Sequence, residues 1–180
     1  AEGEVLQLMN MRDASLSEDG YLLVIRSKTA KLFEASARLG ALLAKAPLAL
    51  EESCAEYGQA LGTAFQVIDD VLDYDGDVSE MGKNLGDDLR EGKATLPLII
   101  AMQRASEAER ATIREAIETG GTAKMAAIIE IVQKTGALVA TRNAAMAEAQ
   151  RALDALKVLP ENVYSNALRQ LASQLLDRRS

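Results

Sequence analysis

One stretch of the sequence carries carboxylates at a spacing suited to metal binding. Positions 61–73 predict an apolar helix, and four polar side chains recur in it at i, i+3, i+4 and i+7, hence on one face: Gln66, Asp69, Asp70 and Asp73. Three carboxylates on adjacent turns of a buried helix repel one another and lose hydration, so cations must offset their charge. Oxygen ligands of this kind suit Mg²⁺, which binds one or two carboxylates, waters and substrate phosphates.

The same pattern has an ordinary alternative, an amphipathic helix whose solvated face is acidic. The glycine-rich segment that follows, residues 74–97, favours the metal site. In it Lys83 and Lys93 each directly follow a glycine, and lysine is a common point-charge partner of phosphate. The segment is not a P-loop, since Gly76 to Lys83 is one residue too long, and not a calcium loop, whose twelfth position would be Asn84. Carboxylates followed by lysines predict a site for a metal–diphosphate.

These motifs together resemble the second aspartate-rich region of trans-polyprenyl diphosphate synthases. The matching residues are Phe65-Gln66-x-x-Asp69-Asp70-x-x-Asp73 and Gly82-Lys83-x-x-Gly86-x-Asp88-Leu89-x-x-Gly92-Lys93-x-Thr95-x-Pro97, with Glu2-Gly3-Glu4-Val5-Leu6-Gln7 and the pair Lys28-Thr29. The resemblance covers essentially the whole chain and is greatest for the octaprenyl and decaprenyl synthases that make quinone side chains. It implies an all-α fold, a helical bundle of the isoprenoid-synthase type, of which this chain would be the C-terminal half.

The resemblance also implies a reaction and a metal. Prenyltransferases of this family elongate an allylic prenyl diphosphate with isopentenyl diphosphate by Mg²⁺-assisted ionisation, condensation and elimination. Transferred to this sequence, Asp69 would bind Mg²⁺ directly, and Asp70 and Asp73 would hold coordinated waters.

Three lysines and two neutral side chains complete the site that the resemblance implies. Lys28, Lys83 and Lys93 would contact the allylic diphosphate, and Thr29 and Gln66 would place dipoles near the developing cation. Without the resemblance, Lys28 would be interpreted as a lysine that extends to water from the edge of an apolar face.

Two segments of the family pattern do not occur in these 180 residues: the first aspartate-rich motif and the glycine-lysine-arginine segment that binds isopentenyl diphosphate. The sequence also opens as if inside a helical region, without an initiator methionine. We therefore expect a C-terminal portion of a longer protein, which is a homodimer when complete and has negligible prenyltransferase activity as this chain alone.

Two other functions are open at this point. A non-catalytic helical subunit could support a partner synthase, although the intact carboxylates and lysines argue against that role. A helical terpene cyclase or head-to-head synthase would use related chemistry, but the segment ending in Lys93-Ala94-Thr95-Leu96-Pro97 argues against it.

The elements that must position these residues are all predicted to be helices, within a single domain over residues 1–180. Ser17 is expected to cap a helix that runs to about position 43. Its apolar stripe consists of Leu22, Ile25, Thr29, Leu32, Ser36, Leu39 and Leu43. The aspartate helix should begin near position 50, where Gly58 and Gly62 would let a neighbouring helix approach closely. Further helices are expected over 98–104, 107–118, 123–134, 137–156 and from Pro160 onward.

Composition argues against several classes of partner and of catalytic site. Apolar residues make up 48% of the chain and aromatic residues 3%, and the net charge of −7 argues against nucleic acid as a partner. No apolar run reaches the length of about 18 residues expected of a membrane anchor, and no signal peptide is visible. The single cysteine, Cys54, suits a reducing cytoplasm. The chain has no histidine, which excludes Ser-His-Asp and Cys-His catalysis and histidine-ligated zinc.

Overall fold

The computed structural model describes residues 2–75, 86–121 and 123–176. Over these ranges every regular element is a helix and no strand occurs, which confirms the all-α expectation. The α-helices are α1 (Glu2–Met9), α2 (Glu18–Ile25), α3 (Lys31–Leu43), α4 (Leu48–Leu72), α5 (Asp87–Arg90), α6 (Leu96–Arg104), α7 (Glu107–Thr119), α8 (Met125–Lys134), α9 (Ala137–Ala155) and α10 (Val163–Leu176). A π-helical turn, η1 (Arg26–Ala30), joins α2 to α3, and a 3₁₀ turn, η2 (Leu156–Val158), follows α9.

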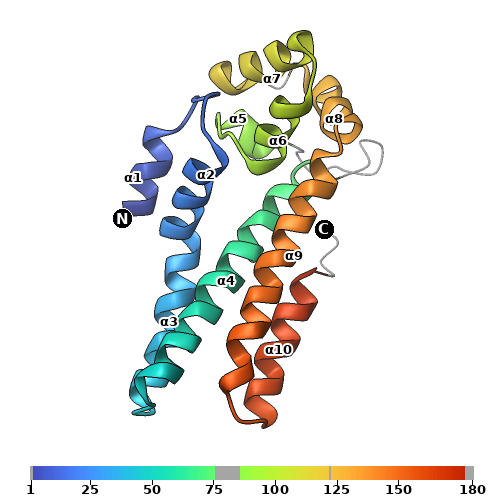
Figure 1. Ribbon diagram of the computed structural model, residues 1–180. Helices are drawn as coiled ribbons and strands as arrows, with labels where there is room; N and C mark the ends of the chain where they lie inside the picture. The colour runs from blue at the N-terminus through green and yellow to red at the C-terminus, as the bar shows by residue number, and fades with distance from the viewer. Residues whose placement is uncertain (1, 76–85, 122, 177–180) are drawn as a thin grey trace.

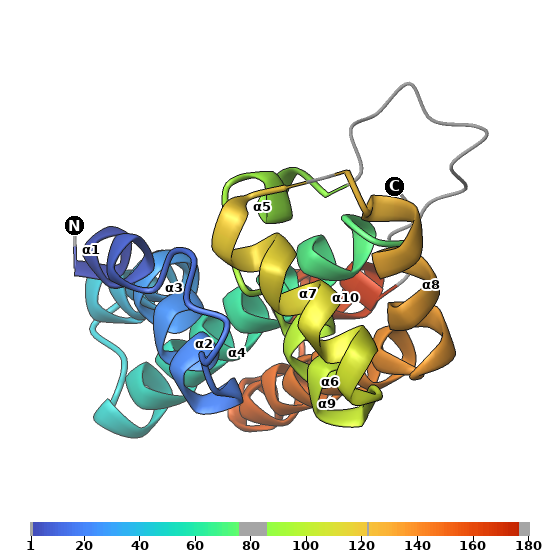
Figure 2. The same cartoon turned by 90° about the horizontal axis from the view of Figure 1, so that it is seen from above.

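Helix α4 is the axis around which the other helices are arranged. It packs between α3 on one side and α9 on the other, and α10 runs beside α9 (Figure 1). The short helices α5 to α8 gather over the carboxyl end of α4, as the view from above shows (Figure 2). The main apolar core lies there, with fully buried side chains from several elements: Ile68, Leu89, Leu98, Ile113, Ile117, Ile128 and Val132. This core fixes the end of α4 that carries the aspartates. Within the part of the chain that the structure describes, no helix combines the length and the apolar character needed to cross a bilayer.

The helix ends form where the sequence places capping residues. The Oγ atom of Ser17 accepts a hydrogen bond from the Gly20 amide at 3.1 Å, which confirms the predicted N-cap. Ser106 opens α7 with a capping box, and Gly120 ends the same helix in the left-handed conformation that glycine adopts without strain.

Two close helix contacts depend on glycine. A Cβ atom on Gly58 would overlap the backbone of Phe33, and one on Gly62 would lie 2.6 Å from the Cα atom of Ala30. Both glycines therefore let α4 approach the η1–α3 segment, as the sequence indicated. A third glycine, Gly3 of α1, touches the same segment from another side, because its Cβ would overlap the backbone of Ser27 and Lys28.

The structure differs from the sequence-based expectation in the helix that begins at Ser17. Three leucines of the predicted apolar stripe are exposed, Leu32 at 71%, Leu39 at 53% and Leu43 at 77%. The cause is η1, because a π-turn accommodates one residue more than an α-helical turn and so shifts the helical phase by one position. After η1 the residues that face α4 are Ala30, Phe33, Ala37 and Ala41, which an uninterrupted α-helical period does not select.

Candidate functional site

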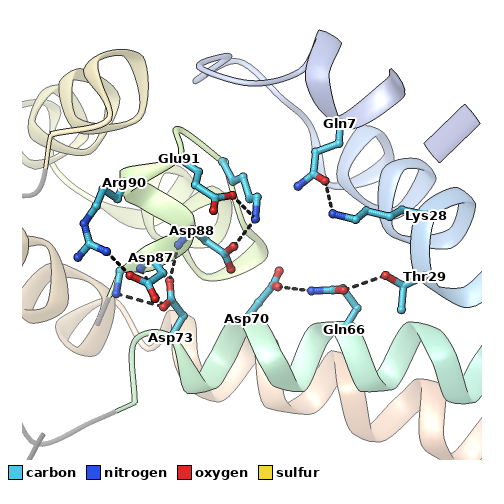
Figure 3. A network of polar contacts seen from close by, with 12 residues as sticks. Gln7, Lys28, Thr29, Gln66, Asp70, Asp73, Asp87, Asp88, Arg90 and Glu91 are labelled. Carbon is cyan, nitrogen blue, oxygen red and sulfur yellow. Dashed lines mark hydrogen bonds and ion pairs between the residues drawn. The ribbon is translucent and has the colours of Figure 1, made fainter. Parts of the chain in front are cut away.

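The π-turn presents the predicted pair Lys28 and Thr29 toward α1 and α4. On the α1 side, the Nζ atom of Lys28 donates a hydrogen bond to Oε1 of Gln7 (Figure 3). The same Nζ atom lies 3.5 Å from a carboxylate oxygen of Glu4. On the α4 side, the hydroxyl of Thr29 donates to Oε1 of Gln66 at 2.9 Å. The short contacts of Gly3 and Gly62 with η1 allow both sets of bonds, since they hold α1 and α4 close to this turn.

A chain of hydrogen bonds continues from Thr29 to the buried carboxylate of Asp70. The Nε2 atom of Gln66 donates to Oδ1 of Asp70 at 3.0 Å (Figure 3). The other oxygen of Asp70, Oδ2, accepts a 2.6 Å bond from the hydroxyl of Tyr21 on α2. Both the oxygen and the nitrogen of the Gln66 amide therefore have a hydrogen-bond partner, and these partners determine the orientation of the amide. The network links residues of α2, η1 and α4 through side chains alone.

The burial of Asp70 destabilises the ionised form of its carboxyl group. Only 2% of the residue is exposed, and this burial, together with the nearby carboxylates of Asp88 and Asp69, raises its pKa from the ordinary 3.8 to about 7. The hydrogen bonds from Tyr21 and Gln66 act in the opposite direction and lower the pKa. Asp70 is thus a carboxyl group poised near neutrality, which a bound cation would convert to the ionised form.

Asp73 binds backbone rather than side chains. Its Oδ1 accepts hydrogen bonds from the amides of Gly86 and Asp87, both at 3.1 Å, and its Oδ2 accepts one from the amide of Asp88 at 3.3 Å. These three amides begin the one-turn helix α5, which lies within the glycine-rich segment over residues 74–97. Burial and the Asp88 carboxylate raise the pKa of Asp73, while the three amides lower it.

Lys93 is held by two carboxylates of the α5 turn. Its Nζ atom lies 2.7 Å from Oδ1 of Asp88 and 2.7 Å from Oε2 of Glu91. Although burial lowers the pKa of Lys93, the hydrogen bonds to Asp88 and Glu91 raise it by more, so this ammonium group keeps its charge. The lysine is therefore a fixed cation that lines the same cavity as Asp70.

These side chains meet around one cavity of about 70 Å³, which has room for several water-sized groups. Its polar lining comes from α1, α2, η1, α4, α5 and the segment before α6: Gln7, Asn10, Tyr21, Lys28, Gln66, Asp70, Asp88, Lys93 and Thr95. Apolar side chains of Met11, Leu16, Val24 and Ile25 close the rest of the wall. A cavity that joins two lysines to two carboxylates can bind an anion and a cation together.

The cavity brings together four of the residues chosen from the sequence: Lys28, Gln66, Asp70 and Lys93. Thr29 reaches it through Gln66. Asp69 is half-buried on α4, and Asp73 is engaged with α5. Lys83 lies outside the described residues.

Among the residues that line the cavity, three bond to predicted site residues without having had a role assigned from the sequence. Gln7 lies in a segment that matches the family, Asp88 lies in the glycine-rich motif, and Tyr21 is a buried tyrosine of α2. For Tyr21 the indication comes from the structure: its phenol is buried, and a buried phenol usually has a hydrogen-bond partner, here Asp70. For Gln7 and Asp88, no local pattern indicates which lysine each would bind.

The donor set can be tested against Mg²⁺. Among the residues that the structure describes, no three acidic, cysteine or histidine side chains are grouped closely enough to enclose a metal ion. Mg²⁺ does not require such a cage, since it is commonly held by one or two carboxylates, waters and substrate phosphates. A carboxylate offers about four lone-pair positions, of which Asp70 uses two and Asp73 three. The oxygen donors therefore fit a metal shared with a phosphate ligand.

Comparison with known proteins identifies the family of this chain. The polyprenyl synthetase family model matches residues 1–135. Over 179 residues the chain is 48% identical to the octaprenyl diphosphate synthase of Haemophilus influenzae, covering 99% of this chain and 54% of that protein. It is 47% identical over 178 residues to a geranyl-diphosphate-specific all-trans-nonaprenyl-diphosphate synthase of Rhodobacter capsulatus, again covering 99% of this chain and 54% of the other.

Solved structures show the same fold. A decaprenyl diphosphate synthase from Rhodobacter capsulatus superimposes with a TM-score of 0.91 at 43% identity, over 98% of this chain and 55% of that one. A polyprenyl synthase from Caulobacter crescentus, complexed with calcium and isoprenyl diphosphate, gives 0.90 at 43% identity over 99% and 55%. The chain spans about half the length of the relatives it matches. On its sequence, its fold and the arrangement of its site, this chain belongs to the polyprenyl synthetase family.

Proposed function

We propose that this chain supplies one wall of the active site of a trans-polyprenyl diphosphate synthase. The reaction proposed is elongation of an allylic prenyl diphosphate with isopentenyl diphosphate to a long-chain product. The observation that carries the proposal is the convergence of Lys28 and Lys93 with Asp70 and Asp88 on one cavity. Two fixed cations suit a diphosphate, and carboxylates between them suit the metal that accompanies it.

The lysines act on the leaving group. Lys28, oriented by Gln7 and Glu4, and Lys93, oriented by Asp88 and Glu91, approach the cavity from opposite sides. Their positive charges stabilise the negative charge that grows on the diphosphate as its bond to the allylic carbon breaks. Because both ammonium groups are already held in place, little reorganisation is needed at that moment.

The neutral side chains act on the carbon centre. The carbonyl dipole of Gln66 and the hydroxyl of Thr29 lie next to the cavity and carry partial negative charge on oxygen. Such dipoles favour a developing allylic cation without offering it a nucleophile. The apolar wall of Val24 and Ile25 keeps water from the same region, which limits hydrolysis of the cation.

Mg²⁺ is the metal proposed, with Asp69, Asp70 and Asp73 as the candidate ligands on α4. When bound, it would supply positive charge that neutralises the diphosphate. A bound cation would also favour the ionised form of Asp70, whose pKa is otherwise about 7. The Caulobacter crescentus relative, which is complexed with calcium and isoprenyl diphosphate, supports binding of a divalent metal together with a diphosphate. For the complete protein, assembly as a homodimer is proposed on the family resemblance.

The first test is binding of inorganic pyrophosphate to this chain, measured by titration calorimetry with and without Mg²⁺. We expect binding that requires Mg²⁺, its loss in Asp69→Ala with an unchanged circular dichroism spectrum, and weakening of roughly 10- to 100-fold in Lys28→Ala, the range that a charge-assisted hydrogen bond is worth. Lys31→Ala is the matched control, since that lysine is exposed and pairs with Glu34. Undiminished binding in Asp69→Ala would move the metal site elsewhere, and equal weakening in both lysine variants would refute a role specific to Lys28.

A further inference from the structure

Asp73 has nearly exhausted its capacity to accept bonds before any metal is considered. Its Oδ1 accepts two backbone amides and its Oδ2 accepts a third. Since a carboxylate offers about four lone-pair positions, about one position is left. Asp70, on the preceding turn, keeps twice that capacity, because it accepts two bonds from the residues that the structure describes. The two carboxylates of the same stripe therefore differ in how many acceptor positions remain for a metal.

The amides that Asp73 binds belong to the turn that carries Lys93. The third amide is that of Asp88, and Asp88 holds Lys93 twice: its Oδ1 lies 2.7 Å from the Nζ atom, and its backbone oxygen accepts the Lys93 amide at 2.9 Å. One continuous series of bonds thus runs from Asp73 through Asp88 to the ammonium group in the cavity (Figure 3).

One other anchor of the turn also comes from Asp73, whose backbone oxygen accepts a 3.2 Å bond from the Gly86 amide, and two lie away from the aspartate helix. The side chain of Leu89 is fully buried in the core, and the backbone oxygen of Gly92 accepts a 2.7 Å bond from the Arg12 amide. Neither contact orients the Asp88 carboxylate. The bond from the Asp88 amide to Asp73 is the polar contact that ties this residue to α4.

We propose that Asp73 is a positioning residue: its carboxylate fixes the start of α5, so that Asp88 holds Lys93 at the cavity, and the metal is left to Asp69 and Asp70. This inference rests on the proposed function for the role of Lys93. It assigns to the third aspartate of the stripe a task in diphosphate binding that acts through a lysine 20 positions away in the sequence.

The test measures the state of Lys93 directly. Each variant is acylated with a water-soluble N-hydroxysuccinimide ester, and mass spectrometry compares the rate at Lys93 with that at exposed Lys31 in the same molecule. In the parent chain the pairing with Asp88 and Glu91 should make Lys93 slow to react. In Asp73→Ala we expect the relative rate to rise at least about tenfold, which corresponds to a fall of one unit in the pKa of the released amine.

Asp73→Asn is the sharper variant. Its amide oxygen can still accept the bonds of Gly86 and Asp87, but its NH₂ group would face the Asp88 amide, so the link to Asp88 is lost selectively. If Asp73→Ala does not fold, this variant carries the test. The matched control is Asp75→Asn, which removes the same charge from an exposed residue that pairs with Arg142.

Two results separate positioning from metal ligation. Positioning requires faster acylation of Lys93 and weaker Mg²⁺–pyrophosphate binding in both Asp73 variants, with Mg²⁺ affinity in the absence of pyrophosphate changed by less than a factor of about three. Lys93 that stays protected, or Mg²⁺ affinity lost as fully as in Asp69→Ala, would overturn the proposal. The acylation result does not depend on whether the chain binds a diphosphate, so failure of the proposed function would be seen separately.

Discussion

Asp70 should make the stability of this chain fall as the pH rises through neutrality. Its pKa is about 7 in the folded chain, against the ordinary 3.8 that applies when the chain unfolds. Between these values the folded chain keeps a proton that the unfolded chain has released, so folding is favoured at lower pH and the advantage disappears as the pH passes about 7. The groups that face Asp70 are Tyr21 from α2, Gln66 and Asp69 from α4, and Asp88 from α5.

The size of the effect follows from the two pKa values. Between pH 5.5 and pH 8 the free energy of unfolding should fall by roughly 2 kcal/mol on account of Asp70. The chain contains no histidine, so no side chain with an ordinary pKa titrates in this interval and obscures the change. Asp70→Asn, which has nearly the same shape and no charge, should remove this dependence.

The assay is urea unfolding at pH 5.5 and pH 8 in buffer that contains a chelator, because a bound cation would hold Asp70 ionised. We expect the variant to gain roughly 2 kcal/mol relative to the parent chain between the two pH values. Asp75→Asn, an exposed control, should keep the slope of the parent chain. Parallel profiles for Asp70→Asn and the parent would show that Asp70 is ionised throughout, and would refute the account of its burial.

Three further outcomes can be checked by the same unfolding measurements. Gly3→Ala should lower the free energy of unfolding by about 1–3 kcal/mol, because its methyl group would overlap the backbone of the π-turn. Gly40→Ala should raise it by about 1 kcal/mol, since nothing lies within 4 Å of its Cβ. Equal changes in the two variants would contradict the close contact between α1 and the π-turn. Tyr21→Phe should cost about 1.5–3 kcal/mol at pH 8 and less at pH 5.5, where Asp70 is protonated, and a loss independent of pH would refute a bond to an ionised carboxylate. Ser106→Ala should cost about 1 kcal/mol through loss of the capping box, and an unchanged denaturation midpoint would show that the cap contributes nothing.

Much of the fold and part of the site could be predicted from the sequence, because the deciding signals are local. The residues that cap or end helices, such as Ser17 and Gly120, act within one turn of chain. The stripe from Gln66 to Asp73 needs only the helical period to place its members on one face. The close approaches at Gly58 and Gly62 likewise follow from the absence of a side chain at two positions one turn apart.

The remaining features depend on partners distant in sequence. Nothing near Lys28 indicates that Gln7 receives its ammonium group, and nothing near Asp73 indicates that the amides 13 to 15 residues later will cap its carboxylate. The π-turn is the clearest case, since its close neighbours Gly3 and Gly62 are distant in sequence and no prediction from residues 26–30 alone included it. The prediction of the apolar stripe was wrong beyond this turn because it assumed one uninterrupted α-helical period across residues 26–30.

The π-turn also determines which mutations the α2–α3 segment can accept. It accommodates one more residue than an α-helical turn, so deletion of any one residue from 26–30 would allow a continuous α-helix to form across the junction. That helix would be regular, and because the lost residue is the extra one of the π-turn, α3 would keep its present phase relative to α2. If the π-turn became α-helical with all its residues kept, α3 would instead turn by about 100°. Leu32 and Leu39 would then face α4 in place of Phe33 and Ala41, against glycines that leave no room for them. Loss of one residue from this segment would therefore keep the contacts between α3 and α4, whereas conversion of the π-turn to an α-helix at constant length would alter them.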